Sequence, residues 1–429
     1  MQYFNKLKKS IKKFFKVPFF GFVKGHSHLS LKQIKEIKSK IEIDDNDLIR
    51  LFEKKFSEKV GTGNSISFAT GRMGFYSLMK ILDIKQGDEV ILQGYTCSVM
   101  PNAIFRLGAT PIYADISLHN LGTSPESVKN LISENTKMIV VQHSFGIPCE
   151  VEEIKKICEE RDIFLLEDCA ISLGSKVHGI QIGNFGDAAL YSFDHSKPIN
   201  AMTGGIIYST NNELINSLMK IQENTDHLSA RHNHLIFNEF IRERRICIPE
   251  KYGRDDLYKF FRNFSIKEYA YLDEDFEKKA SSSYPYPAKL PSFVAQLGLY
   301  EIERWDDELI KRREMLKDFI NFFIRNGMKE HIPESYFDTR LEIIPSRLIL
   351  LHKQAGEIKD KCNSFLQTNW FWFTSPISEC LDPKELGYVY GSCKNSETAS
   401  KEILNLPCVH EEKYNDFLFE KSLSFIKQF

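Results

Sequence analysis

Two stretches of the chain place reactive side chains directly after apolar runs. The run Ile163–Leu166 leads into Asp168, and Lys197 follows shortly after the run Ala188–Ser192. Ligands of α/β sheets bind at the carboxyl ends of the strands, so we expect both side chains at one site. A lysine amine can bond to an aldehyde cofactor, and a carboxylate can keep a pyridine nitrogen protonated so that the ring accepts electrons. The pair therefore indicates a pyridine-ring cofactor bound covalently through Lys197.

Each residue alone has an ordinary explanation, since a lysine in a turn is usually solvated and an aspartate after a strand often caps a helix. A third element favours the site. Ser65–Thr70 predicts a strand, and Gly71-Arg72-Met73-Gly74 begins a helix at once. Glycine lets a ligand approach closely, and the outward amides of a first helical turn bind phosphate. The G-x-G-x-x-G dinucleotide fingerprint is absent, and Gly61-Thr62-Gly63 precedes its strand instead of following it.

The elements that must position these residues alternate between strand and helix from about residue 60 to residue 225. The predicted strands are short and mostly apolar: Ser65–Phe68, Glu89–Leu92, Pro111–Asp115, Met138–Gln142, Ile163–Glu167, Ala188–Ser192 and Gly205–Tyr208. The predicted helices between them are Met73–Ile81, Val99–Leu107, Val151–Arg161 and Glu213–Asn224. This pattern predicts an α/β domain with a mainly parallel sheet that is buried on both faces.

The rest of the chain divides around this domain. We expect a basic helical segment over residues 1–58, a large cofactor-binding domain over 59–290 and a smaller α+β domain over 291–429. Residues 226–283 are charged and aromatic and break the alternation, so we interpret them as an insertion or lid in the large domain. Helical periodicity returns at Ser292–Phe323.

Composition narrows the class of protein. The chain has 57 basic and 58 acidic side chains and a net charge of -1, which argues against binding to nucleic acid. Its nine cysteines form no C-x-x-C pair and no cluster with histidine at metal-ligand spacing. We therefore expect reduced thiols, a cytoplasmic location and no metal site.

The N-terminus shows an amphipathic pattern. Phe4, Leu7, Ile11 and Phe14 fall on one helical face and are surrounded by lysines. We favour a helix that packs on its own protein or on a partner subunit. The alternative is weak contact with an anionic membrane surface. The apolar stretch Phe14–Val23 is interrupted by Lys16 and Pro18 and is too short to span a bilayer.

The order of several motifs resembles the DegT/DnrJ/EryC1/StrS aminotransferases, which are fold-type-I enzymes with a large mainly parallel-sheet domain and a smaller α+β domain. The resemblance runs through most of the chain. Its motifs are Ala69-Thr70-Gly71-Arg72, Gly87-Asp88-Glu89-Val90-Ile91, Gly108-Ala109-Thr110-Pro111 ahead of Asp115, His143-Ser144-Phe145-Gly146, Glu167-Asp168-Cys169-Ala170, Gly186-Asp187-Ala188, Ser192-Phe193 with Lys197 and Gly204-Gly205, Ala295-Gln296-Leu297-Gly298-Leu299 with Arg312-Arg313, and Ile403-Leu404-Asn405-Leu406-Pro407.

The resemblance implies pyridoxal 5'-phosphate as the cofactor. It implies that Lys197 bonds to the cofactor and that Asp168 contacts the protonated ring nitrogen. Gly71, Arg72 and Ser192 then hold the phosphate. The roles of the lysine, the aspartate and the Gly71 cradle also follow from the residues themselves, whereas Ser192 comes from the resemblance alone.

The chain departs from the family pattern in several places. An aromatic ring is usual near the cofactor where this chain has Cys97, and Tyr95 is our candidate for that stacking. A hydrogen-bonding side chain is usual at the position of Ile171. The element that reaches the partner subunit's phosphate is Pro287-Ala288-Lys289 here, so Lys289 is our candidate for the cross-subunit cation and a homodimer with shared sites is expected.

Three histidines were considered as further site residues. His143 lies at a strand end, and we interpret it as a satisfied loop histidine, with a pocket position as the alternative. His195 flanks Lys197 and is expected to contact substrate without being catalytic. His178 is assigned no role.

These residues predict an aminotransferase that moves an amino group from an amino acid, expected to be glutamate, to a keto group of a nucleotide-linked sugar, for cell-surface polysaccharide or related glycan synthesis. One alternative is a dehydratase of the same fold, in which histidine typically replaces the lysine. The other is a catalytically silent relative. Lys197 and Asp168 argue against both.

Overall fold

A seven-stranded sheet forms the centre of the large domain. The computed structural model describes residues 18–254, 284–408 and 411–429. The strands of the sheet are β1 (Asn64–Phe68), β2 (Glu89–Gln93), β4 (Thr110–Ala114), β5 (Thr136–Gln142), β6 (Phe164–Asp168), β9 (Ala188–Ser192) and β10 (Gly205–Ser209), in the spatial order β1-β10-β9-β6-β5-β2-β4. The first and last residues of all seven strands lie within two residues of the bounds predicted from the sequence.

The sheet is parallel except at one strand. β10 pairs antiparallel with both β1 and β9, and the pairs β9–β6, β6–β5, β5–β2 and β2–β4 are parallel. Almost every residue of these strands is buried, as expected for a sheet that is covered on both faces. The predicted mainly parallel α/β domain is confirmed.

Helices cover the sheet and join its strands. They are α4 (Gly71–Ile81), α5 (Val99–Phe105), α6 (Pro125–Leu131), α7 (Val151–Arg161) and α8 (Asn212–Glu223). Side chains cap several of them: Thr70 accepts from the amide of Met73 in α4, and Asn211 accepts from two amides of α8. The helix predicted at Ser292–Phe323 is two helices, α11 (Ser292–Glu303) and α12 (Trp305–Arg325), which meet at Arg304.

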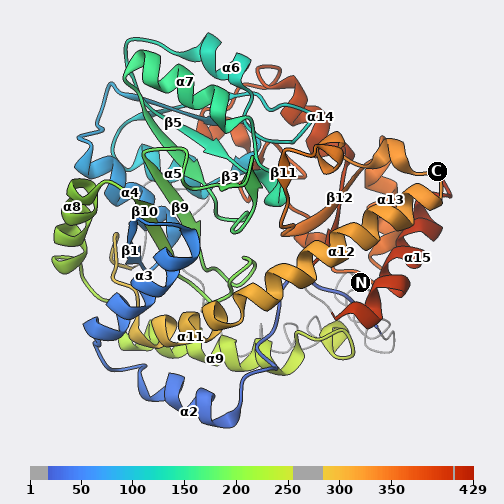
Figure 1. Cartoon of the computed structure of the whole chain (residues 1–429), viewed down its shortest axis with the longest axis horizontal. Helices are drawn as coiled ribbons and strands as arrows, with labels where there is room; N and C mark the ends of the chain where they lie inside the picture. Colours follow the sequence, from blue (N-terminus) through green and yellow to red (C-terminus); the bar gives the residue numbers. More distant parts are fainter. Residues whose placement is uncertain (1–17, 255–283, 409–410) are drawn as a thin grey trace, which may run out of the picture.

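Two large buried clusters organise the described residues. The first contains the sheet, its helices, α11 and two N-terminal helices, α2 (Leu31–Ser39) and α3 (Asn46–Val60). The second contains residues from Met315 to Ile426 together with Phe20 and Phe22. Residues 18–29, here called the N-terminal strap, therefore insert aromatic side chains into the C-terminal core. Figure 1 shows this blue segment running from the C-terminal elements down to α2.

The C-terminal part is a small α+β unit. Its antiparallel strands β12 (Arg347–Leu351) and β14 (Ile403–Pro407) are joined by α13 (Ala355–Cys362) and α14 (Lys394–Glu402), and α15 (Asn415–Ile426) packs on α12 and α13. Short strands complete the fold: β3 (Thr96–Cys97) with β13 (Ile377–Ser378), and β7 (Lys176–Val177) with β8 (Ile180–Gln181) and β11 (Leu341–Glu342). The β3–β13 pair links the two parts of the chain.

Part of the predicted insertion is a helix, α9 (Ala230–Ile246), which lies with α11 beneath the sheet in Figure 1. Residues 255–283 of that insertion lie outside the described residues, as does the amphipathic pattern from Phe4 to Phe14. Within the described ranges, every helix is too short or too polar to cross a bilayer.

Candidate active site

A cavity of about 720 Å³ opens at the carboxyl ends of β6 and β9. Its lining comes from the large domain, from α9 and from residues 369–375, 378 and 379 of the small unit. Val23 of the N-terminal strap also lines it. The predicted site residues that line the cavity are Gly71, Arg72, Asp168, Ser192 and Lys197.

Asp168 and Lys197 reach this cavity from neighbouring strands, because β6 and β9 pair with Asp168 opposite Leu190. Asp168 is only 6% exposed, and its Oδ1 accepts a hydrogen bond from the Ala170 amide at 3.0 Å. Burial raises the pKa of Asp168, and the Ala170 amide and the charge of Lys197 oppose that rise. Lys197 is half-buried in the turn after β9, where its amide donates to the Asp194 carbonyl.

Another part of the cavity lining forms an anion cradle. Gly71 begins α4, so the amides of Gly71 and Arg72 precede the hydrogen-bond ladder of the helix and lie at its positive end. Ser192 closes the cradle from the end of β9. A Cβ built on Gly205 would lie 2.2 Å from Gly71 Cα, so only glycine lets β10 pass this close to the cradle.

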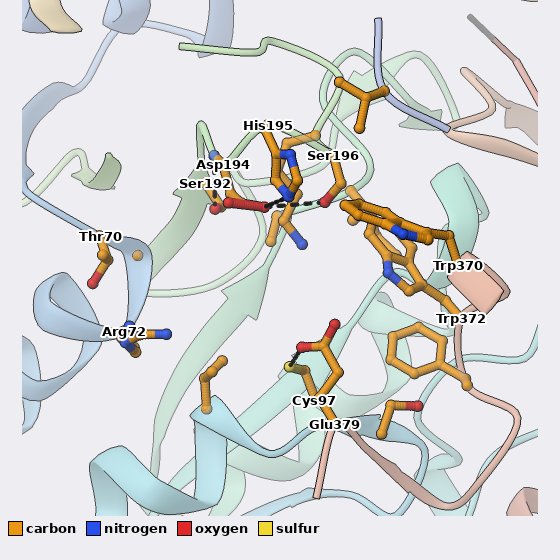
Figure 2. Close-up of a pocket in the computed structure, with 18 of the residues that line it drawn as sticks. Thr70, Arg72, Cys97, Ser192, Asp194, His195, Ser196, Trp370, Trp372 and Glu379 are labelled. Atoms are coloured by element: carbon orange, nitrogen blue, oxygen red, sulfur yellow. Dashed lines mark hydrogen bonds and ion pairs between the residues drawn. The ribbon is translucent and has the colours of Figure 1, made fainter. Parts of the chain in front are cut away.

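These residues fit a phosphorylated pyridine aldehyde. An amine and a buried carboxylate lie at neighbouring strand ends, and a helix N-terminus with a hydroxyl lines the same cavity. Figure 2 shows Thr70, Arg72 and Ser192 on the side away from the tryptophans. Ile171 also lines the cavity and offers no hydrogen bond there.

The helix α9 contributes charged residues to the cavity lining that were not predicted from the sequence. His195 Nδ1 lies 2.9 Å from Glu243 Oε1, and Asn200 Nδ2 donates to Glu243 Oε2 at 3.3 Å. Glu239 and Arg242 of the same helix pair with one another and line the cavity. The inserted segment thus holds His195 beside Lys197.

A thiol and a carboxylate face the cavity from the β3–β13 pair. Cys97 Sγ donates to Glu379 Oε2 at 3.1 Å, as Figure 2 shows. Burial and the neighbouring Glu379 charge raise the pKa of Cys97 well above its usual range. Cys97 is therefore a neutral thiol at physiological pH and a poor nucleophile.

His143 is a structural residue. It is fully buried, its Nδ1 accepts from the Cys149 amide at 3.1 Å, and its Nε2 lies 3.1 Å from Glu167 Oε2. Glu167 also accepts from the amides of Gly183, Phe185 and Gly186, each at 2.7 Å. Both side chains are satisfied inside the fold, in agreement with the favoured interpretation of His143.

Comparison with protein families shows to which family the chain belongs. The family model described as the DegT/DnrJ/EryC1/StrS aminotransferase family matches residues 27–243. The chain belongs to this family.

Curated relatives are similar over part of their length. The chain is 32% identical over 171 residues to GDP-perosamine synthase of Vibrio cholerae, which covers 40% of this chain and 47% of the relative. It is 32% identical over 167 residues to dTDP-4-dehydro-2,3,6-trideoxy-D-glucose 4-aminotransferase of Saccharopolyspora spinosa, covering 38% and 43%. The matched part thus spans less than half the length of these relatives.

The fold extends over almost the whole chain. NtdA of Bacillus subtilis, solved with bound cofactor PMP, superposes with a TM-score of 0.71 at 16% sequence identity and covers 96% of this chain and 86% of that one. At that identity the likeness is one of fold, and it confirms the predicted fold-type-I class.

Tyr95 is our candidate for the ring that stacks on the cofactor, but the structure places another aromatic side chain beside Lys197. Tyr95 does not line the cavity; its ring is fully buried in a cluster with Ile171 and Phe373. The ring that approaches the lysine is Trp372, whose centroid lies 4.6 Å from Lys197 Nζ. The run Trp370-Phe371-Trp372-Phe373 was visible in the sequence, but nothing local indicated that the fold brings it to the cavity.

Lys289 also lies outside the cavity lining of its own chain. It is half-buried, and its amide donates to the Asp226 carbonyl at 2.9 Å. The preceding Ala288 accepts from the Ala69 amide, so this segment runs beside the strand end that leads into the cradle. A role for Lys289 toward a partner subunit therefore stays a prediction.

Proposed function

We propose that this protein is a pyridoxal-phosphate-dependent aminotransferase that transfers an amino group from an amino acid, with glutamate as the expected donor, to a keto group of a nucleotide-linked sugar. The observation that carries the proposal is the meeting of Lys197, Asp168 and the Gly71–Arg72–Ser192 cradle in one cavity. The names of the relatives support the sugar substrate, since the Saccharopolyspora spinosa relative is named as an aminotransferase of a dTDP-linked sugar.

Each of these residues has a separate role toward the cofactor. Pyridoxal phosphate, when bound, supplies an aldehyde and a ring that accepts electrons. The amides of Gly71 and Arg72 and the Ser192 hydroxyl bind its phosphate. The Asp168 carboxylate would keep a proton on the ring nitrogen, and that positive charge would favour the ionised aspartate that burial alone disfavours.

Lys197 has two roles in this scheme. With the cofactor bound, its Nζ would hold the aldehyde, and its free amine would be the group that moves a proton at the substrate carbon. The Trp372 ring beside Nζ holds the amine over the site. Together with α9, the aromatic segment 370–373 lines the cavity around the reacting groups.

The test is a two-stage assay on the full chain. Glutamate added to the cofactor-loaded protein should release 2-oxoglutarate, and a panel of keto-sugar nucleotides should then gain nitrogen by mass. Lys197→Ala serves as the inactive control. A product that loses oxygen without gaining nitrogen would identify the dehydratase, and no turnover of either kind would identify a silent relative.

The proposal also includes the cellular location, the oligomeric state and the biosynthetic role of the enzyme. All nine cysteines are unpaired, which supports a reducing, cytoplasmic location. The position of Lys289 outside its own cavity supports a homodimer in which each chain completes the partner's site. We place the activity in the synthesis of cell-surface polysaccharide or a related glycan.

A further inference from the structure

The N-terminal strap meets α11 through two histidines and a glutamate. His26 is 1% exposed, and its Nδ1 lies 3.1 Å from Glu301 Oε1. His28 Nε2 lies 2.8 Å from the same oxygen. We propose that His26, His28 and Glu301 form a site for a divalent transition metal of the zinc class, which fastens the strap to α11.

The geometry suits a metal. The three potential ligand atoms lie within 4.8 Å of one another. In a tetrahedral zinc site with bonds of about 2.0–2.2 Å, ligand atoms are roughly 3.4 Å apart. The contacts of 3.1 and 2.8 Å to Glu301 need to lengthen slightly, and no pair of ligand atoms is more than about 1.4 Å too far apart. Two nitrogens and one carboxylate oxygen are ligand types that zinc binds in proteins, with a water completing the shell.

Hydrogen bonding alone accounts for the cluster poorly. Two imidazoles converge on one carboxylate oxygen, and only the His26 contact has hydrogen-bond geometry. His28 Nε2 lies closer to the same oxygen and is attracted to it, but its alignment is poorer than that of a regular hydrogen bond. A cation between the three atoms would give each nitrogen lone pair a partner.

A second cluster of similar composition shows the contrast. His143, Glu167 and Cys169 also lie close enough to share an ion. There, however, both nitrogens of His143 have partners, and Glu167 accepts three amides besides. The ring nitrogens of His143 thus have regular hydrogen bonds inside the fold, whereas His28 Nε2 has only the poorly aligned contact with Glu301.

Charge and access are compatible with a bound cation. Arg304 Nη1 lies 3.9 Å from Glu301 Oε2, on the other oxygen, and Lys24 is paired with Glu308. The local charges are thus mixed, and zinc sites built from neutral imidazoles need no excess of negative charge. His28 lines a second cavity of about 770 Å³, which offers a path for the ion and room for water.

The site would act on the active-site wall. Lys24 O accepts from Asn200 Nδ2 at 3.1 Å, and the adjacent Val23 lines the candidate active site. A Cβ on Gly25 would lie 2.7 Å from the Glu243 carbonyl, so the strap is pressed against α9. A metal at His26 and His28 therefore fixes the end of a segment that helps to form the cavity.

The experiment uses the full chain with any affinity tag removed. After chelator treatment, the protein is dialysed against low-micromolar Zn²⁺, and bound metal is measured by elemental analysis. We expect one equivalent in the wild type and its loss in His26→Gln/His28→Gln. Removing even an outer-shell partner costs about 10- to 100-fold in affinity, so loss of two ligands should cost at least about 100-fold. The matched control is His227→Gln/His234→Gln, which removes two half-exposed surface histidines.

Two further measurements test the proposal on the wild-type protein, without any variant. Zinc-soaked wild-type crystals should show anomalous density between His26, His28 and Glu301, and zinc should slow amide exchange in residues 18–29. Wild-type protein that retains no zinc would overturn the proposal and leave a hydrogen-bonded cluster. Zinc bound elsewhere, or equally by the double variant, would overturn it as well. None of these readouts depends on aminotransferase activity.

Discussion

The ring of Trp372 contacts both the amine of Lys197 and the guanidinium of Arg347. Lys197 Nζ lies 4.6 Å from the ring centroid, and Arg347 Cζ lies 3.5 Å from it. Arg347 is fully buried, forms no ion pair with the described acids, and donates to the Trp370 carbonyl and to Asn405. Burial holds the pKa of Arg347 well below its usual range. The aromatic ring is thus anchored from the small unit and presented to the lysine.

If the ring positions Lys197, Trp372→Ala should lower kcat/KM by about 10-fold, since a desolvated cation–π contact contributes about 1–2 kcal/mol. Trp372→Phe should lose less, because an aromatic face remains. The control is Phe337→Ala, which removes a surface ring that Lys329 approaches at 5.3 Å far from the cavity. Wild-type kinetics in Trp372→Ala would show that the contact does not matter for turnover.

Asp168→Asn should leave the protein folded, because the amide oxygen can still accept from Ala170. Turnover should fall by roughly 30-fold to several thousand-fold, since losing a buried charged hydrogen bond costs about 2–5 kcal/mol. Asp194→Asn, in the same cavity, is the control and should keep most activity. A fully active Asp168→Asn enzyme would reduce the aspartate to a cap for the following turn.

Asp168 should also make the stability of the cofactor-free protein depend on pH, and Asp168→Asn should remove that contribution. The pKa of Asp168 is raised in the fold, so the folded state binds more protons than the unfolded state between the ordinary and the raised value. The stability of the cofactor-free wild type should therefore fall as pH rises through that window and remain lower above it. Asp168→Asn cannot ionise, so its cofactor-free form should unfold at a higher temperature than wild type at pH 7. Equal stability at all pH values would contradict the burial argument.

Gly205→Ala tests the anion cradle. The added Cβ would lie 2.2 Å from the backbone of Gly71, so either β10 or the start of α4 must move. Cofactor affinity should fall at least about 10-fold, and overpacking should lower stability by about 1–3 kcal/mol. Gly356→Ala is the matched control, since its Cβ would meet nothing within 4 Å in α13. Unchanged cofactor affinity in Gly205→Ala would mean that the phosphate binds elsewhere.

Mixed dimers test the cross-subunit role of Lys289. Homodimers of Lys289→Ala and of Lys197→Ala should both be impaired. A mixed dimer contains one site with both lysines intact if the two residues of a site come from different chains, so differently tagged, co-expressed variants should recover part of the activity. A Lys289→Ala homodimer with wild-type activity would make the lysine a surface residue. Impairment without recovery would place its action within its own chain.

Local sequence patterns were sufficient for the sheet and for two residues at its strand ends. The strands are short apolar runs, and Asp168 and Lys197 follow from where those runs stop, whereas Ser192 was added by the family resemblance. The residues that sequence analysis missed reach the cavity only through tertiary packing. Trp372 comes from the small unit and Glu243 from a helix inside the region interpreted as an insertion.

The N-terminal strap shows the same limit. Phe20 and Phe22 pack in the core of residues 315–426, and His26 meets Glu301 at a separation of 275 residues. The His26-x-His28 pair stands in the sequence, but its partner Glu301 is 275 residues away from His26, so the cluster could not be recognised from local spacing. Long-range contacts of this kind can be predicted only when the fold is known.

The most direct test of the central claim is borohydride reduction of the cofactor-loaded protein followed by peptide mapping. The account predicts one stoichiometric adduct, on the peptide that contains Lys197, and its absence from Lys197→Ala. An adduct on another lysine, or no adduct in protein shown to hold the cofactor, would contradict the assignment of Lys197 and with it the proposed chemistry.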